Sequence, residues 1–350
     1  MSAYGGNRWA TTHILLSMKA VIYDRFGDPR EVLQVREVPM PPSPGANQVR
    51  VRMLASPVNP SDLLRIRGNY GDLPSFPASS GFEGVGVIDA VGPGILRFLR
   101  GLKPGRRVAV LNSLGGNWAE YVVLPARNVV PVPDDLPDEQ VASFFVNPAT
   151  VLVMIKHVLC VKRGECLLQT AAGSALGRMV IRLGQHLGFR TINVVRRREQ
   201  ADELKKLGVE TICSSDETIE ERALQLTQGA GVPYALDAVG GSAGLGAARS
   251  LGANGRMLVY GTLSGEPIPV EPRLLIAGQK QIAGFWLSEW VRAQNVLTML
   301  RLFRQIVQHM RLKVLTTTVA ATYPLDQVQT AVKQAATPGG GKVLLRCGSA

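Results

Sequence analysis

Short runs in which apolar and polar residues alternate follow one another through the first third of the chain. Clusters of proline and glycine separate these runs, as in segment 41–45, which reads Pro-Pro-Ser-Pro-Gly. Alternation with a period of two is typical of half-buried strands, and such clusters are typical of turns. We therefore predict a β-rich domain over residues 18–137, with strands at 18–23, 49–54, 84–90, 107–111 and 119–124.

From about residue 138 the pattern changes to helical periodicity that alternates with short apolar strands. Helices are expected at 138–158, 175–188, 199–207, 242–251 and 291–311, and strands at 165–170, 191–195, 233–237, 255–260 and 281–286. This alternation predicts an α/β fold, with a doubly wound parallel sheet of the Rossmann type over residues 138–313. The tail, 314–350, returns to strand-like segments around a short helix at 325–336, and we expect it to rejoin the first domain.

One unit of the second region is a candidate nucleotide site. Residues 164–198 read as strand, tight turn, helix and strand, an arrangement that places a pyrophosphate at a helix N-terminus. Ala172 and Ser174 stand where the first two glycines of the usual fingerprint would be. What remains is a run of small residues and Gly177, where the helix must pack closely on the sheet. Alone, this is a weak match to a dinucleotide-binding turn.

The end of the second strand of this unit indicates which dinucleotide is bound. Units that bind NAD carry Asp or Glu there for the ribose 2′-hydroxyl, whereas this chain carries Arg196, Arg197 and Arg198. Guanidinium groups suit a 2′-phosphate dianion. We therefore predict NADPH rather than NADH. The alternative is a dehydrogenase-like fold with a solvated basic turn and no nucleotide.

Length and composition favour a two-domain globular protein without a membrane span. The 350 residues favour two domains, and no apolar run reaches the roughly 18–20 residues that span a bilayer. The four cysteines show no Cys-x-x-Cys spacing and follow no secretory signal, so we expect reduced thiols in the cytoplasm or, in a eukaryote, the mitochondrial matrix. Residues 1–17 are expected to be a disordered leader; a mis-set start before Met18, a cloning remnant and a poor transit peptide all stay open.

The formal charge of +12 is unevenly distributed. Residues 290–325 contain no Asp or Glu, but they include Arg292, Arg301, Arg304, Arg311 and Lys313. Helical spacing places Arg301 and Arg304 on one face. A basic surface near an active site would attract a phosphorylated substrate or an acidic carrier protein. No recognition module for nucleic acid accompanies it, and a general arginine bias of the proteome is the other explanation of the excess.

The order of a β-rich domain, an inserted nucleotide domain and a returning tail resembles the medium-chain dehydrogenase/reductase superfamily, over residues 18–346. The resemblance implies a GroES-like fold for the first domain. Many members hold a catalytic zinc ion through a Cys in a Cys-x-x-Asp turn and a His in Gly-His-Glu, where this chain has Asn59 and Phe82. Zinc takes thiolate, imidazole or carboxylate ligands, and no cysteine precedes Cys160, so we expect no metal. The substrate must then be polarised already, as in a conjugated enone or enoyl thioester.

Within the superfamily the chain is most similar to the 2-enoyl thioester reductases, which act on enoyl-CoA or enoyl-ACP. The similar stretches are 68–71, 116–118, 146–150, 191–196 and 284–290, of which the last, with two tryptophans, is the most specific. The resemblance implies that Tyr70 is the catalytic tyrosine. It also implies NADPH contacts from Asn147, Gly173, Ser174, Ala175, Leu176, Arg196, Arg197, Arg198, Tyr260, Gly261, Thr262, Leu263, Phe285, Trp286, Leu287 and Lys342. The chain departs from the family at Arg197, often Asp, and at Gly173, often Asn.

Tyr70 suits the chemistry that such a substrate requires. Hydride goes to the β-carbon and a proton to the α-carbon, and charge develops on the carbonyl oxygen, so a nearby donor lowers the barrier. A phenol in a Gly-Asn-Tyr-Gly loop has the backbone freedom to reach a cleft. Plain structural roles stay open: Tyr70 as a packed loop residue, Trp286 as core, Asn147 as a helix cap and Lys342 as a solvent-facing residue. The four histidines show no ligand or dyad spacing and receive no role.

The sequence thus predicts an NADPH-dependent reductase of 2-enoyl thioesters in which Tyr70 donates the proton. A zinc-free quinone or alkenal reductase, which needs no dedicated donor, is the first alternative. A basic NADPH-binding protein that has lost catalysis and binds RNA or a partner is the second. By resemblance we also expect a homodimer that pairs the edge strand at 281–286. Acyl carrier protein is a candidate partner; neither a membrane nor specific nucleic acid is expected.

Overall fold

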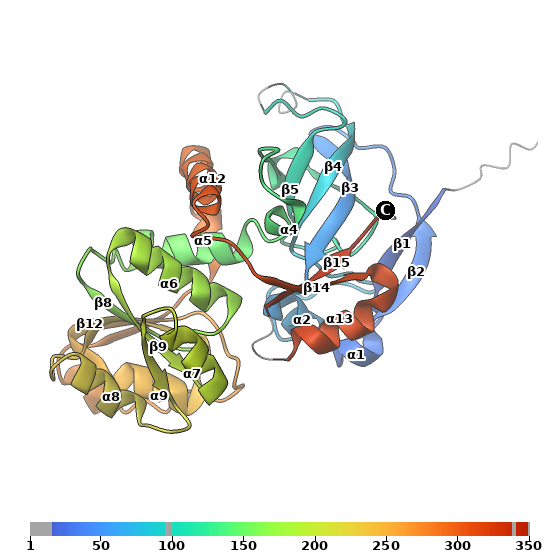
Figure 1. Cartoon of the computed structure of the whole chain (residues 1–350). Helices are drawn as coiled ribbons and strands as arrows, with labels where there is room; N and C mark the ends of the chain where they lie inside the picture. The colour runs from blue at the N-terminus through green and yellow to red at the C-terminus, as the bar shows by residue number, and fades with distance from the viewer. Residues whose placement is uncertain (1–15, 95–97, 99, 338–340, 349–350) are drawn as a thin grey trace, which may run out of the picture.

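The structure is a computed structural model that describes residues 16–94, 98, 100–337 and 341–348. The chain forms two lobes (Figure 1). We name them the β-rich lobe, which holds the N-terminal third of the chain and the C-terminal tail, and the α/β lobe, which holds the middle. Most of the expected leader, residues 1–15, lies outside the described residues.

The β-rich lobe is built on a mostly antiparallel sheet whose strand order among the described residues is β14-β15-β3-β4-β5-β7, with β6 paired to β3. Alternate residues of the central strand β3 are buried, as its sequence pattern predicts. A separate pair, β1 and β2, and two short helices, α1 and α2, complete it. The bounds are β1 Ser17–Ile22, α1 Pro29–Val32, β2 Gln34–Pro39, β3 Gln48–Pro57, α2 Pro60–Ile66, β4 Glu83–Val91, β5 Arg107–Leu111, β6 Tyr121–Pro125 and β7 Val129–Pro131.

The tail closes the β-rich lobe. Strands β14 (Val319–Pro324) and β15 (Lys342–Arg346) pair in parallel, and β15 also pairs antiparallel with β3. Helix α13 (Val328–Ala335) lies between them in the chain and packs on α1 and β15. The C-terminal segment therefore belongs to the same sheet as strands more than 250 residues earlier in the chain.

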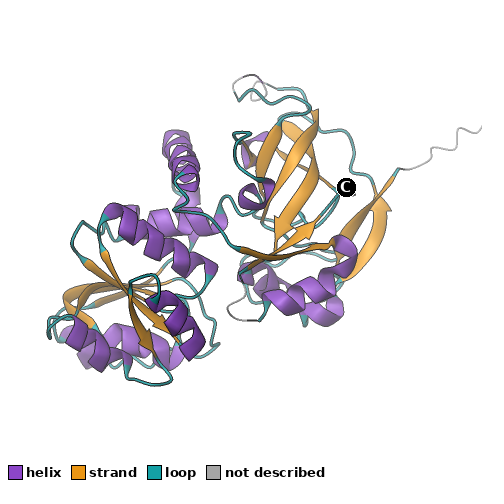
Figure 2. Cartoon of the chain, viewed as in Figure 1, coloured by secondary structure: helices purple, strands orange, loops and turns teal. Residues whose placement is uncertain are grey.

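The α/β lobe is a parallel sheet with helices on both faces (Figure 2), and the α/β fold predicted from the alternation is confirmed. Its strand order among the described residues is β10-β9-β8-β11-β12-β13. Strands are β8 Cys166–Gln169, β9 Arg190–Val195, β10 Glu210–Cys213, β11 Val232–Asp237, β12 Leu251–Val259 and β13 Gln281–Gly284. Helices are α5 Val146–Leu152, α6 Ala175–Leu187, α7 Arg198–Lys205, α8 Ile219–Leu226, α9 Gly241–Arg249, α10 Pro272–Ile276, α11 Leu287–Arg292 and α12 Val296–Arg311.

Two of the predicted helices are each divided into separate elements in the structure, so the prediction of one continuous helix is wrong for both. The segment 138–158 contains α4 (Asp138–Val141), α5 and a π-helical stretch, Val153–Val158, with a break before α5. The segment expected at 291–311 divides into α11 and α12 because Asn295 caps a new helix; its Oδ1 accepts a hydrogen bond from the Thr298 amide at 2.9 Å. β10 and α8 had no predicted counterpart.

Candidate active site

Tyr70 and Trp286 join the two lobes. Tyr70 lies in the loop after α2, and Trp286 immediately precedes α11. The indole Nε1–H donates to the Tyr70 hydroxyl oxygen at 2.9 Å, and the two rings meet edge to face with centroids 5.8 Å apart. Trp286 remains 36% exposed, so the alternative that it is plain core is wrong. The structure therefore brings together the predicted proton donor and one predicted cofactor residue.

Two arginines hold the loop that carries Tyr70. The buried Arg65 donates from its guanidinium to the carbonyl oxygens of Asp72, at 2.7 Å, and Leu114, at 3.0 Å. From the other lobe, Arg292 forms an ion pair with the Asp72 carboxylate at 3.5 Å. The buried Arg65 therefore anchors the loop, and the exposed Arg292–Asp72 pair adds a weaker contact from the other lobe.

The ionisation of Tyr70 is set by this environment. Burial raises the pKa of the Tyr70 phenol above its usual value near 10, the Trp286 N–H lowers it in part, and the negative charge of Asp62 raises it again. Near neutral pH the phenol is therefore protonated. Because the indole N–H occupies one acceptor site of its oxygen, the hydroxyl hydrogen is left to donate.

Asp62 organises the wall beside Tyr70. Its buried carboxylate accepts hydrogen bonds from the backbone amides of Asn59, Gly81 and Phe82 and from the Ser80 hydroxyl, at 2.9–3.2 Å. Burial raises the pKa of Asp62 to about 7, against the effect of these donors. The arrangement places the Phe82 ring 5.8 Å from that of Tyr70.

A buried polar network occupies the position where the superfamily pattern would place zinc. Lys342 Nζ donates to Asn59 Oδ1 at 2.5 Å, and Asn59 Nδ2 donates to Glu83 Oε1 at 3.1 Å. A zinc ion does not fit these residues, because Phe82 offers no ligand and the ammonium of Lys342 already occupies the Asn59 oxygen. Within the described part of the chain no group of three His, Cys, Asp or Glu side chains could hold a metal.

Glu83 connects this network to the α/β lobe. Its Oε2 accepts from the backbone amides of Phe145 and Val146, both at 2.9 Å, at the start of α5. These contacts also explain the break before α5, because Glu83 supplies acceptors for amides that lack a helical partner. Sequence reasoning assigned no role to Asp62 and Glu83, although they are the acidic residues at the Cys-x-x-Asp and Gly-His-Glu positions.

The predicted cofactor residues gather at one edge of the parallel sheet. Ranges 173–176, 196–198, 260–263 and 285–287 follow the carboxyl ends of β8, β9, β12 and β13, respectively. β8 lies between β9 and β11, so it marks the point where the strand order reverses, which is where such sheets bind ligands. Four segments far apart in sequence are therefore brought to one site.

The turn after β8 fits a dinucleotide pyrophosphate. Ser174 caps α6, its Oγ accepting from the Gly177 amide at 3.1 Å, so α6 presents its N-terminal amides at this edge. A Cβ on Gly177 would come within 2.6 Å of the Ala172 carbonyl oxygen, which confirms the close helix–sheet packing expected there. Ala175 begins the helix, and Leu176 packs into the core.

The arginines after β9 differ in their surroundings. Arg196 is exposed and Arg197 is half-buried. Arg198 is paired with Asp216, its Nε and a terminal nitrogen donating to Oδ2 at 3.0 and 2.8 Å. Two carboxylates thus lie beside the basic cluster: Asp216, which the fold brings there, and Glu199, which follows Arg198 in the chain. The three guanidinium groups outnumber these two acids, so the segment keeps a net positive charge that suits a phosphate.

The other predicted cofactor residues occupy distinct environments. Tyr260 is half-buried with its hydroxyl unpartnered among the described residues, Gly261 packs on the Ala238 carbonyl, and Thr262 and Leu263 are exposed. Phe285 and Leu287 pack against the core of the lobe. Asn147 lies inside α5 rather than at its cap, which is Phe145, so the capping alternative is wrong. Lys342 is 5% exposed, so the solvent-facing alternative is wrong as well.

The basic stretch 290–325 is less charged than its sequence indicates. Arg311 makes two hydrogen bonds to the Asp135 carboxylate, at 2.8 and 2.9 Å, and Arg292 pairs with Glu289 and Asp72. Acids from other parts of the chain thus neutralise two of the five cations. Arg301 and Arg304 are exposed on α12, as the helical spacing predicts.

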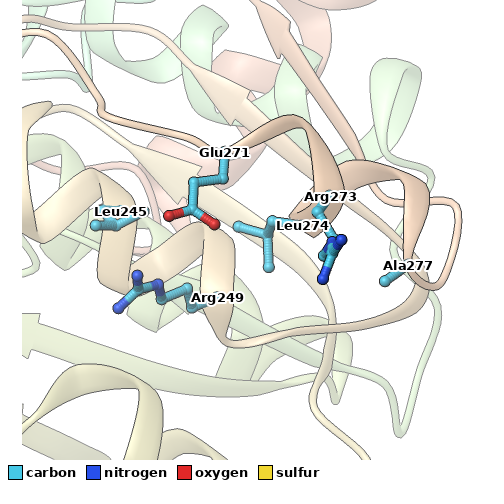
Figure 3. Close-up of a pocket in the computed structure, with 6 residues that line it drawn as sticks. All are labelled: Leu245, Arg249, Glu271, Arg273, Leu274 and Ala277. Carbon is cyan, nitrogen blue, oxygen red and sulfur yellow. The ribbon is translucent and has the colours of Figure 1, made fainter.

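A groove lies between α9 and α10, on elements that contribute none of the predicted site residues (Figure 3). Its volume is about 240 Å³, and it is lined by Leu245, Arg249, Glu271, Arg273, Leu274 and Ala277. This is below the size that usually holds a ligand, roughly 300–1,000 Å³. None of the residues that line the groove belongs to the predicted site, so the groove is not part of the candidate active site.

Comparisons with known proteins agree with this arrangement. Residues 45–134 match the model of the alcohol dehydrogenase GroES-like domain, and residues 175–304 match that of the zinc-binding dehydrogenase. The human mitochondrial enoyl-[acyl-carrier-protein] reductase is 33% identical over 326 residues, covering 92% of this chain and 86% of that protein. The chain belongs to the medium-chain dehydrogenase/reductase superfamily. It is an oxidoreductase of the branch that contains enoyl reductases and quinone oxidoreductases.

Solved structures of that superfamily show the same fold. A quinone oxidoreductase from Pseudomonas syringae is 28% identical, with a TM-score of 0.85, and covers 94% of this chain and 99% of its own. The Escherichia coli quinone oxidoreductase, solved in complex with NADPH, is 25% identical with a TM-score of 0.84, covering 94% and 99%. Among the described helices, none combines the length and apolar character needed to cross a membrane.

Proposed function

We propose that this superfamily member reduces the conjugated C=C bond of a 2-enoyl thioester, an enoyl-CoA or enoyl-ACP, with NADPH. The observation that carries the proposal is the hydrogen bond from Trp286 to Tyr70. It places a protonated phenol beside a residue that follows the last strand of the nucleotide sheet. The 33% identity to an enoyl-[acyl-carrier-protein] reductase over most of the chain supports the same substrate class.

In this proposal the α/β lobe binds the cofactor through its sheet edge. Gly173, Ser174, Ala175 and Leu176 receive the pyrophosphate, and Arg196, Arg197 and Arg198 receive the 2′-phosphate. Asn147 and residues 260–263 and 285–287 complete the contacts. NADPH, when bound, supplies the hydride that adds to the β-carbon. The NADPH complex of the Escherichia coli relative, which has the same fold, supports this assignment.

Tyr70 supplies the acid of the reaction. Negative charge develops from the carbonyl oxygen to the α-carbon as hydride arrives at the β-carbon, and the phenol donates a proton to it. Trp286 then stabilises the tyrosinate oxygen through its N–H donor, and water returns the proton. Because zinc does not fit the Asn59 corner, the thioester conjugation polarises the substrate.

Quinone reduction is the second candidate, and the fold of the quinone oxidoreductases supports it. A quinone is a strong electrophile that takes its proton from water, so this reaction would not use Tyr70 as an acid. A catalytically inactive NADPH-binding protein is the third possibility, and the family relationship disfavours it. An NADPH-oxidation screen with crotonyl-CoA, longer enoyl-CoAs, 1,4-benzoquinone and acrolein tests the proposal. Preference for the enoyl thioesters supports it, and turnover of only quinone or acrolein contradicts it.

The proposal extends to partners and location. Arg301 and Arg304 are exposed near the apolar, exposed Leu297 and Leu300, a combination that suits an acidic carrier protein. The sheet edge at β13 suits a homodimer, since three of its four residues are exposed. By similarity to mitochondrial enoyl-[acyl-carrier-protein] reductases, the mitochondrial matrix is the proposed location in a eukaryote, and the cytoplasm elsewhere.

A further inference from the structure

Three buried residues from separate segments form a continuous chain of hydrogen bonds. Lys342 is on β15, Asn59 precedes α2, and Glu83 begins β4; none is more than 5% exposed. Lys342 donates to the Asn59 amide oxygen, the Asn59 amide nitrogen donates to Glu83, and Glu83 accepts from the first amides of α5. The chain therefore runs from the C-terminal strand to the first helix of the other lobe.

The charges of Lys342 and Glu83 fix the orientation of the Asn59 amide between them. The Asn59 amide turns its oxygen to a cation and its nitrogen to an anion, so it relays the charge of Lys342 to Glu83. The other carboxylate oxygen of Glu83 faces two N–H groups at the start of α5, where a helix lacks intrahelical acceptors and favours negative charge. Each side chain in the network thus has a hydrogen-bond partner of complementary polarity.

The charge balance makes the network sensitive to a change at either end. Burial raises the pKa of Glu83 and lowers the pKa of Lys342, whereas each charge favours the ionised form of the other. Removing one partner leaves the second charge buried without compensation, which costs more than replacing both. The loss of Lys342 would thus destabilise the charge of Glu83 and weaken its hydrogen bonds to the amides of Phe145 and Val146.

We propose that Lys342, Asn59 and Glu83 are positioning residues that couple strand β15 to the start of α5 and thereby hold Asn147 at the cofactor site. The inference rests on the proposed NADPH site, but not on the thioester substrate. It gives Lys342 a role through Asn59 and Glu83, in place of the direct cofactor contact implied by family resemblance.

The two roles of Lys342 predict different results in a double-mutant cycle. The variants are Lys342→Met, Glu83→Gln and the two combined, with Lys333→Met, exposed on α13, as the matched control. The NADPH dissociation constant is measured by fluorescence titration, without turnover. We expect Lys342→Met to weaken NADPH binding at least tenfold, the double variant to recover most of that loss, and the control to bind as wild type. A double variant that binds no better than Lys342→Met would overturn the proposal and favour direct contact.

A second variant keeps the test decisive if Lys342→Met fails to fold. Asn59→Ala cuts the relay without altering the charge, and it leaves Lys342 able to reach a phosphate. We expect a several-fold weaker NADPH affinity; unchanged affinity in a folded variant would overturn the proposal. Wild-type protein that binds NADPH but reduces no thioester would contradict the proposed function while leaving this inference intact.

Discussion

The Tyr70 hydroxyl and the Trp286 indole are 216 residues apart in sequence, yet their hydrogen bond of 2.9 Å spans the two lobes. Neither lobe alone contains this pair. The ion pair between Asp72 and Arg292 reinforces the same junction. The proposed proton donor is therefore positioned only when the lobes are assembled as in this structure.

The pH dependence of enoyl-CoA reduction should report the ionisation of Tyr70. Because burial raises the pKa of the phenol above 10, the acid form persists through neutral pH and is lost only as pH rises through this elevated value. We expect the midpoint of the Tyr70-dependent decline in kcat to lie above the ordinary phenol pKa near 10, with initial rates measured to limit thioester hydrolysis. A decline centred below pH 9 that disappears in Tyr70→Phe would contradict this assignment.

Cofactor preference should depend on the arginines after β9. Each lost charge-assisted contact to a phosphate costs roughly 1.5–3 kcal/mol. The double change Arg196→Ala, Arg198→Ala should therefore weaken NADPH binding by at least roughly tenfold and leave NADH nearly unchanged, as measured by calorimetry. Arg163→Ala, exposed before the opposite end of β8, is the control. Equal losses for NADPH and NADH would rule out recognition of the 2′-phosphate.

Zinc should be absent from the purified enzyme. The expectation follows from the Lys342 ammonium on Asn59 and from Phe82, which has no ligand atom. Elemental analysis should find no stoichiometric zinc, and treatment with a chelator should leave reduction of crotonyl-CoA unchanged. One firmly bound zinc ion per chain would invalidate the argument that the substrate alone provides the polarisation.

The enzyme should form a homodimer through the edge strand β13. Light scattering should give twice the chain mass of 37.7 kDa. Ala283→Lys places a charge on an exposed position of that edge and should shift the protein toward monomer, because charged edge residues oppose strand pairing. Lys333→Glu in the other lobe should not. A wild-type monomer at tens of micromolar would refute the expectation.

Sequence pattern located most regular elements but not their interruptions. Hydrophobic periodicity identified most strands of both sheets, because burial on one face leaves a local trace in the chain. The break before α5 depends on the carboxylate of Glu83, which is more than 60 residues away in sequence. The hydrophobic period within 138–158 carries no sign of it, although Pro148 is a residue that favours the first turn of a helix. β10 had no predicted counterpart, although β8 and β13, which are equally short, were predicted.

Some residues of the candidate site could be predicted from the sequence, whereas their pairings could not. Tyr70, Trp286 and the residues after β8 and β9 could be proposed from motifs and family resemblance, since each lies within a recognisable segment. The pairing of Arg198 with Asp216 and of Lys342 with Asn59 could not, because it depends on which segments the fold brings together. Buried charges such as Asp62 and Glu83 look like ordinary polar residues until their partners are known.

The role of Tyr70 is the central claim. Tyr70→Phe removes the phenolic donor and keeps the ring that packs against Phe82 and Trp286. We expect turnover of an enoyl-CoA to fall by roughly 10²–10⁴-fold, the usual range for a positioned acid. NADPH affinity should stay close to wild type, because the hydroxyl acts on charge that develops only in the transition state. Quinone reduction should be affected much less.

The most direct measurement is therefore the ratio of kcat for crotonyl-CoA to kcat for 1,4-benzoquinone, compared between wild type and Tyr70→Phe at saturating NADPH. We expect this ratio to fall by at least roughly a hundredfold in the variant. If Tyr70→Phe reduces crotonyl-CoA as fast as wild type, Tyr70 is a packing residue, and quinone or alkenal reduction becomes the better description of the enzyme.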